Sequence, residues 1–194
     1  MCSSDLVPRQ LGSTRQSDAC IATYPGDMAV AMRVLDAMVE TVKADGSTRA
    51  IPIADFHRLW GDTPHIETVL EPGELITGVE LPPPSDAVTQ SEYRKVRDRS
   101  SYAFALISVA GGLALSDGRI AEARIALGGV AAKPWRASRA ETALVGVAPT
   151  PDAFQAAIRE ELIGAQPLSG NGFKIGLVER TVVAVLTALA GEHA

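Results

Sequence analysis

The alternation of apolar and polar residues divides the first part of the chain into recognisable elements. Apolar residues recur at helical spacing after Pro25 and Asp27, two residues that suit the first turn of a helix. Further on, Asp45 and Gly46 are typical of a hairpin turn, because both turn positions favour positive φ. The elements expected here are a helix at Asp27–Met38, hairpin strands at Glu40–Ala44 and Thr48–Ile53, a helical turn at Phe56–Leu59, a short segment at Glu67–Leu70 and a strand at Leu75–Leu81.

Three consecutive prolines, Pro82–Pro84, mark the clearest boundary in the chain, because proline neither continues a helix nor donates to a strand ladder. After it, Asp117 and Gly118 form a second hairpin signal between two alternating runs. Thr150 is a candidate N-cap. The expected elements are strands at Ser91–Arg97, Phe104–Leu115 and Arg119–Val130, then helices at Ser138–Leu144, Pro151–Leu162 and Lys174–Leu189.

This order of elements predicts an α+β fold. The three strands form an antiparallel meander, and the helices that follow pack on one face of it. The glycine pairs at 111–112 and 128–129 lie within or at the ends of strands and lack the spacing of a dinucleotide-binding loop. We interpret them as bulges or points where another segment approaches closely.

Composition narrows the class of protein. The chain has 194 residues and a net charge of −5, so it suits one or two small domains, and the charge argues against a nucleic-acid surface. No apolar run approaches the roughly 20 residues that a membrane-spanning helix needs. The two cysteines, Cys2 and Cys20, exclude a disulfide framework. His57 and His65 lie among acids, but their spacing fits no standard metal site, so solvated surface side chains are expected.

Three segments carry chemistry that packing alone does not require. Asp27 follows a Pro-Gly turn, where helix N–H groups and an acid could hold a hydroxyl-bearing ligand; the alternative is a plain first-turn acid. Residues 94–99 hold four cations in six positions, and the alternative is a solvated strand edge. Residues 128–137 join a glycine-rich strand end to a cation and an aromatic residue, and the alternative is a turn into a helix.

Four stretches resemble a known family in order and spacing over about Cys20–Ala194. They read CIATYPGDMAVAM, IPIADFHRLWGDTPHIETVLEPGELITGVELP, YRKVRDRSSYAFALISVAGG and LGGVAAKPWRA. The chain resembles the FAD-binding middle subunit of molybdenum-containing hydroxylases, the xanthine dehydrogenase and carbon monoxide dehydrogenase superfamily. Within it, three-subunit aldehyde oxidoreductases are the most similar type.

The resemblance implies a fold and a role. It implies the C-terminal part of a PCMH-type FAD-binding domain, followed by a domain of a three-stranded antiparallel sheet and helices. Electrons would leave the substrate at a molybdenum cofactor on a large partner subunit and pass two [2Fe–2S] clusters on a small one. They would then reach FAD on this subunit and leave to an external acceptor. A heterotrimer, or its dimer, would result.

Individual residues of this sequence match residues of the family's cofactor sites. Asp27 matches an acid near the ribityl and phosphate part of FAD, and Ile76 an aliphatic residue near the isoalloxazine. Lys95 matches a flavin-contacting lysine, with Arg94 as the alternative if the register slips by one. Tyr102 falls near a ring-stacking tyrosine. Cys20 resembles the last ligand of an additional [4Fe–4S] cluster in the intact protein, and a free buried cysteine is the alternative.

The family chain has a further N-terminal flavin subdomain with a glycine-rich pyrophosphate loop, which this sequence lacks. We therefore expect residues 1–13 to be a non-native leader, residues 14–84 the second part of a flavin domain, and residues 85–194 a domain like the carbon monoxide dehydrogenase flavoprotein C-terminal domain. We expect this chain alone to bind FAD weakly or not at all and to be inactive. The competing hypothesis is a non-enzymatic module that contacts partner subunits. The sequence names neither substrate, acceptor nor compartment.

Overall fold

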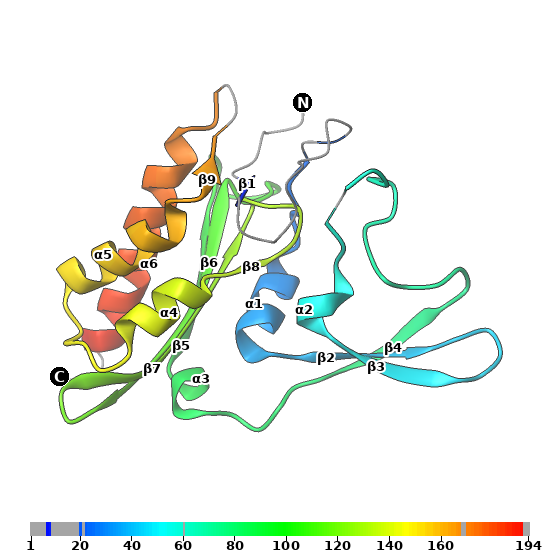
Figure 1. Cartoon of the computed structure of the whole chain (residues 1–194), viewed down its shortest axis with the longest axis horizontal. Coiled ribbons are helices and arrows are strands. Elements are labelled where there is room, and N and C mark those ends of the chain that lie inside the picture. The colour runs from blue at the N-terminus through cyan, green and yellow to red at the C-terminus, as the bar shows by residue number, and fades with distance from the viewer. Residues whose placement is uncertain (1–6, 9–19, 21, 60, 168–169, 192–194) are drawn as a thin grey trace.

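The computed structural model describes residues 7–8, 20, 22–59, 61–167 and 170–191 and confirms the α+β class (Figure 1). Among them, no helix is both long and apolar enough to cross a membrane. The strands are β1 (Val7–Pro8), β2 (Met38–Val42), β3 (Thr48–Pro52), β4 (Leu75–Glu80), β5 (Ser91–Val96), β6 (Ile107–Ser116), β7 (Arg119–Gly128), β8 (Trp135–Arg136) and β9 (Ala165–Gln166). The helices are α1 (Asp27–Leu35), α2 (Ile53–Phe56), α3 (Asp86–Thr89), α4 (Ser138–Leu144), α5 (Pro151–Leu162) and α6 (Phe173–Gly191).

Two antiparallel sheets organise these elements. The first has the order β3-β2-β4, and the second has the order β5-β6-β7-β8. The short strands β1 and β9 pair separately. The predicted three-stranded meander is present, but the sheet has a fourth strand. Trp135 and Arg136 form it by pairing with Leu127 and Ala126. Two residues carry too little periodicity to be recognised as a strand from sequence.

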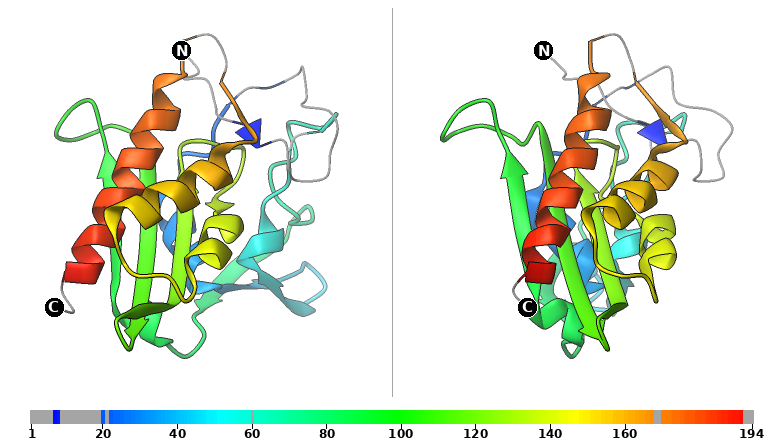
Figure 2. Two further views of the ribbon diagram at one scale, coloured as in Figure 1. Left: turned by 60° about the vertical axis from the view of Figure 1, so that its left-hand side comes forward. Right: turned by 90° about the vertical axis from the view of Figure 1, so that its left-hand side faces the viewer.

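The four-stranded sheet is covered on both faces: the helices that follow its strands lie on one face, as predicted, and a helix that precedes them lies on the other (Figure 2). Helices α4, α5 and α6 cover one face, where the main core lies. Helix α1 covers the other, where Val30 and Val34 pack on Ala110 and Ala126. This double cover explains why β6 is buried at eight consecutive positions, as expected for an almost continuous apolar run.

Glycines allow this close packing on both faces of β6. A Cβ on Gly111 would lie 2.8 Å from a side-chain carbon of Val185 in α6. A Cβ on Gly112 would lie 2.2 Å from the backbone oxygen of Ala87 in α3, on the opposite face. The interpretation of this pair as a point of close approach is confirmed.

The three-stranded sheet is held by the buried carboxylate of Glu74. It accepts hydrogen bonds from Thr41 Oγ1 at 2.6 Å, from Arg49 Nε at 2.6 Å and from the Glu71 backbone N–H at 2.8 Å. The hydrogen bond from Arg49 is the main reason that the pKa of Glu74 falls to about 2. This carboxylate therefore ties the loop before β4 to β2 and β3.

Two arginines of the four-stranded sheet hold the C-terminal end of α1. The helix ends at Leu35 and not at Met38 as predicted, because Asp36 takes a left-handed conformation with φ 52°. Arg124 Nη1 and Arg136 Nη1 each lie 3.0 Å from an Asp36 carboxylate oxygen. The same two nitrogens also donate to backbone carbonyls in the last turn, and cations are favourable at this end of a helix dipole.

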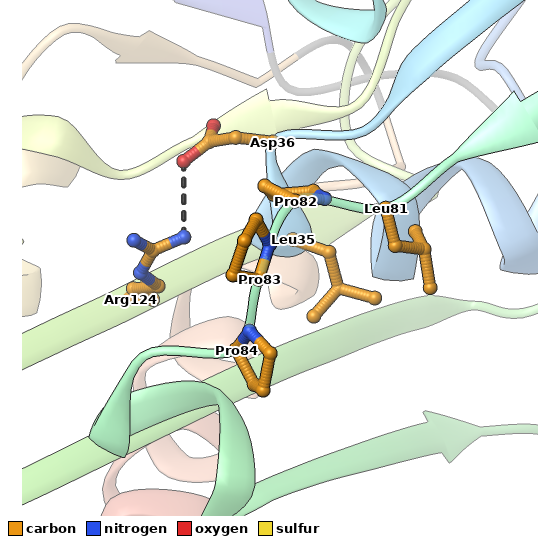
Figure 3. A pocket seen from close by; sticks show the side chains of 7 residues that line it. All are labelled: Leu35, Asp36, Leu81, Pro82, Pro83, Pro84 and Arg124. Carbon is orange, nitrogen blue, oxygen red and sulfur yellow. Dashed lines mark hydrogen bonds and ion pairs between the residues drawn. The ribbon is translucent and has the colours of Figure 1, made fainter.

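The proline segment Pro82–Pro84 lies next to the C-terminal end of α1. Pro82, Pro83 and Pro84 form no regular secondary structure and line a groove of about 460 Å³ together with Leu35, Asp36, Leu81 and Arg124 (Figure 3). In Figure 3 the Arg124 side chain is turned toward Asp36 and not toward the proline rings. The groove is therefore mostly apolar, and its one ion pair is engaged in holding α1.

Candidate functional site

The start of α1 is built to expose backbone donors. Gly26 precedes the helix and gives no side-chain cap to its first turn. A Cβ on Gly26 would lie 2.4 Å from a ring carbon of Tyr24, so glycine is required for the ring to lie there. The first N–H groups of a helix have no partner within the helix. Asp27, the first helical residue, therefore stands beside a set of backbone donors.

Strand β5 brings two polar side chains to Asp27. Lys95 Nζ lies 2.7 Å from Asp27 Oδ2, and the Tyr93 hydroxyl donates to Asp27 Oδ1 at 2.8 Å. Residues two apart on a strand share a face, so Tyr93 and Lys95 point to the same side of β5. We call Asp27, Tyr93 and Lys95 the Asp27 cluster.

Arg94, the alternative to Lys95, does not join this cluster. It points to the other face of the strand and pairs with Glu92, whose carboxylate lies 2.6 Å from Arg94 Nη2. The structure therefore brings Lys95 and not Arg94 to Asp27.

The pKa values of Asp27 and Tyr93 keep the two side chains in complementary protonation states. Partial burial raises the pKa of Asp27, but the hydrogen bonds from Lys95 and Tyr93 outweigh it, so the pKa lies below the usual 3.8. Burial and the Asp27 carboxylate raise the pKa of Tyr93 to about 12. Asp27 is thus a charged acceptor and Tyr93 a protonated donor at neutral pH.

The other two residues expected near the flavin lie apart from this cluster in the fold. Tyr102 lies in the loop after β5, has a φ of 51° and is 94% exposed. Arg99 donates to its backbone carbonyl. Ile76 lies on β4 of the three-stranded sheet and is 52% exposed. Both side chains are available for contact, but neither is held in place by packing.

Cys20 is partly exposed, and its sulfur accepts a hydrogen bond from the Ala22 N–H at 3.5 Å. Within the described ranges, no group of three or more His, Cys, Asp or Glu side chains is arranged to hold a metal ion. Cys2 lies outside the described residues. The assignment of Cys20 as a cluster ligand stays a prediction.

His57 is not the solvated side chain that the sequence predicted. It is 5% exposed, and its ring packs edge-on against Tyr24 at 4.4 Å and Phe56 at 5.1 Å between centroids. Among the residues that the structure describes, its Nδ1 has no hydrogen-bond partner. Burial, together with the nearby charge of Lys133, lowers the pKa of His57 from 6.5 to about 4. His65 is exposed, as predicted.

The depressed pKa of His57 predicts a loss of stability in mild acid. Below pH 6.5 His57 becomes protonated in the unfolded chain but stays neutral in the folded chain. The contribution of neutral His57 to the free energy of unfolding is therefore fully present above pH 6.5 and declines as the pH falls toward 4. Between pH 7.5 and pH 5 the free energy of unfolding should fall by about 2 kcal/mol. Urea denaturation of wild type and His57→Phe measures this. The variant should lose this pH dependence, His65→Gln should keep it, and an unchanged slope in His57→Phe would contradict the account.

The glycine-rich segment at 128–137 serves packing. Gly129 has a φ of 70°, and its carbonyl accepts a hydrogen bond from the buried Lys174 Nζ at 2.8 Å. The Ala131 carbonyl accepts from the Tyr24 N–H at 3.0 Å, which ties the segment before α1 to this loop. Trp135 donates to the buried Glu161. The alternative of a turn that leads into a helix therefore describes this segment better than a ligand loop.

Sequence reasoning missed Tyr93. Its signal was the Tyr-x-Lys spacing on a predicted strand, which places both side chains on the face that Lys95 uses. The partner, Asp27, lies 66 positions away in the sequence, so the contact itself required the fold.

Comparison with known proteins covers both parts of the chain. Residues 16–84 match the family described as the FAD binding domain in molybdopterin dehydrogenase, and residues 91–174 match the CO dehydrogenase flavoprotein C-terminal domain. The aldehyde oxidoreductase FAD-binding subunit PaoB of Escherichia coli K12 is 51% identical over 178 residues, which cover 92% of this chain and 52% of PaoB. The chain belongs to the FAD-binding subunits of the molybdenum hydroxylase family.

Solved structures support this membership. The structure of quinoline 2-oxidoreductase from Pseudomonas putida 86 aligns with a TM-score of 0.74 and 26% identity, covering 87% of this chain and 57% of that one. Carbon monoxide dehydrogenase from Oligotropha carboxidovorans gives a TM-score of 0.71 and 26% identity, covering 86% and 57%. The chain thus spans little more than half the length of these relatives.

Proposed function

We propose that this chain supplies one wall of an FAD site in the electron-transferring subunit of a molybdenum-containing hydroxylase. The observation that carries the proposal is the Asp27 cluster at the start of α1. The residues there fit the group. Backbone N–H groups and Lys95 suit its phosphates or a negatively charged flavin, and a carboxylate suits a ribityl hydroxyl. Bound FAD would supply a ring system that takes up electrons singly and releases them in pairs.

The ion pair between Asp27 and Lys95 resolves an electrostatic conflict. A lone carboxylate beside a diphosphate would repel it, and the repulsion grows where water is excluded. Lys95 Nζ, at 2.7 Å, offsets this charge, so Asp27 can accept a hydrogen bond from a hydroxyl close to phosphate. Lys95 is 22% exposed, which leaves it accessible to a ligand. Ile76 and Tyr102 are then the candidate contacts for the isoalloxazine.

Within the complex we assign this subunit the last step of electron transfer. Support comes from the similarity to an aldehyde oxidoreductase subunit and to carbon monoxide dehydrogenase. A large subunit with the molybdenum cofactor and a small one with [2Fe–2S] clusters would be its partners, and FAD would pass electrons to an external acceptor. A [4Fe–4S] cluster at Cys20 in the intact protein belongs to the same proposal.

Flavin affinity tests the proposed site. Because we expect the chain alone to bind FAD weakly, the chain is titrated into FAD up to millimolar concentration and followed by flavin fluorescence. Binding should be at least tenfold weaker for Asp27→Ala and for Lys95→Ala, since each removes a charge-assisted hydrogen bond worth about 1.5–3 kcal/mol. Arg94→Ala is the matched control on the opposite face of β5 and should leave the affinity unchanged. Equal affinity in all three variants would contradict the flavin role and favour a module that only contacts partner subunits.

A further inference from the structure

Side chains from β5 and β6 gather at the start of α1. The buried hydroxyl of Ser108 on β6, 1% exposed, is close enough to the Tyr93 phenol to act on its pKa, which it lowers. Tyr93 in turn donates to Asp27 Oδ1, and Asp27 Oδ2 accepts from Lys95. Ser108 pairs directly with Lys95 in the sheet, so Tyr93 is its diagonal neighbour on the same face.

We propose that Tyr93, supported by Ser108, is a positioning residue that holds the Asp27 carboxylate against the sheet and away from the N–H groups of α1. The proposal rests on the flavin-binding role of Asp27. It assigns Tyr93 no direct part in electron transfer.

The geometry of Asp27 carries this inference. A short acidic side chain in the first turn of a helix readily bonds to nearby backbone N–H groups, which would block them. In this protein both Asp27 oxygens are engaged from the side of β5, one by the phenol and one by the ammonium group. Gly26, the residue before the helix, has no side chain that could bond these N–H groups. The carboxylate and the N–H groups therefore remain available to one ligand at the same time.

Gly128 leaves the room that the Ser108 side chain occupies beneath α1. A Cβ at this position would lie 2.3 Å from Ser108 Oγ and 2.6 Å from Val30 Cγ2 of α1. Only glycine leaves room for a hydroxyl on β6 and a packed helix above it. The raised pKa of Tyr93 keeps the phenol protonated, so it stays a donor through the neutral range.

A double-mutant cycle on FAD affinity tests the positioning role. Tyr93→Phe keeps the ring and removes the hydroxyl, and it should weaken FAD binding three- to tenfold while the free energy of unfolding stays nearly unchanged. In an Asp27→Ala background the same substitution should have no further effect, because its target is gone. Ser108→Ala should weaken binding by less. Ser116→Ala, at the exposed far end of β6, serves as a control for the loss of a hydroxyl outside the cluster.

The carboxyl carbon resonance of Asp27 gives a second readout that does not depend on flavin. It should shift in Tyr93→Phe and stay in place in Ser116→Ala. Additive losses of affinity in the double variant, or full affinity in Tyr93→Phe while Asp27→Ala is weakened, would overturn the positioning role and leave the flavin site standing. Full affinity in Asp27→Ala itself would overturn the flavin proposal and this inference with it.

Discussion

Replacing Glu161 by alanine should destabilise the protein by about 3–5 kcal/mol, because a buried carboxylate with three donors disappears. Glu161 lies on α5 and is 6% exposed. One oxygen accepts from Trp135 Nε1 at 2.9 Å, and the other accepts from the backbone N–H groups of Arg139 at 2.8 Å and Ala140 at 3.2 Å. The last two belong to the first turn of α4, which has no cap of its own.

Urea denaturation followed by circular dichroism measures this loss. Glu160→Ala removes the same side chain from the exposed neighbouring position and should change the free energy of unfolding by less than about 0.5 kcal/mol. Glu161→Gln should fall between the two, since an amide supplies one acceptor and not two. Similar stability of the Glu161 and Glu160 alanine variants would contradict the view that α5 caps α4 through this carboxylate.

Replacing Arg136 by alanine should weaken the attachment of α1 to the sheet by about 3 kcal/mol. Arg136 is 12% exposed and bonds to the Arg33 carbonyl at 2.8 Å and to Asp36 Oδ1 at 3.0 Å. It also pairs with Glu141, whose carboxylate accepts from the Ile125 N–H. Its loss removes this cation from the Glu141 carboxylate and the Arg33 carbonyl, whereas Asp36 keeps its ion pairs with Arg124 and Arg33.

Native-state hydrogen exchange locates this effect. The amides of α1 and β2 should lose protection in Arg136→Ala, whereas those of α5 and α6 should keep it. Arg159→Ala breaks an ion pair with Glu179 in which Arg159 is 62% exposed, and it should change little. A uniform loss of protection over all helices would contradict a local joint at α1.

Local signals predicted most elements, although the helical turn expected at Phe56–Leu59 lies instead at Ile53–Phe56. Thr150 caps α5 by accepting from the Ala153 N–H at 3.3 Å, and α5 has the predicted bounds. Asp117 and Gly118 both have positive φ, as their hairpin turn requires. At the first hairpin only Gly46 does, because the turn closed by the Gly46 N–H and the Lys43 carbonyl has Ala44 and Asp45 at its centre and places the glycine just after them. Caps and turns of this kind are predictable from sequence because they depend on residues only a few positions apart.

Contacts between distant segments were not predictable in the same way. The periodicity of α1 showed an apolar stripe but not which surface it covers, and that surface is the far face of a sheet formed about 80 residues later. His57 lies in a polar stretch, and its burial comes from Tyr24 and Phe56. For the candidate site, Asp27 and the cations at 94–99 stood out in the sequence and the family resemblance selected Lys95 among them, whereas Tyr93 came from the three-dimensional arrangement.

Backbone amide resonances of the chain, recorded with increasing FAD, test the central claim most directly. We expect FAD at up to millimolar concentration to shift the amides of the first turn of α1 and the end of β5, with Asp27 and Lys95 among the largest changes. The amides of Leu35 and Leu81 at the proline-lined groove should not move. Shifts that leave the first turn of α1 and the end of β5 untouched would contradict the assignment of this surface as part of the flavin site.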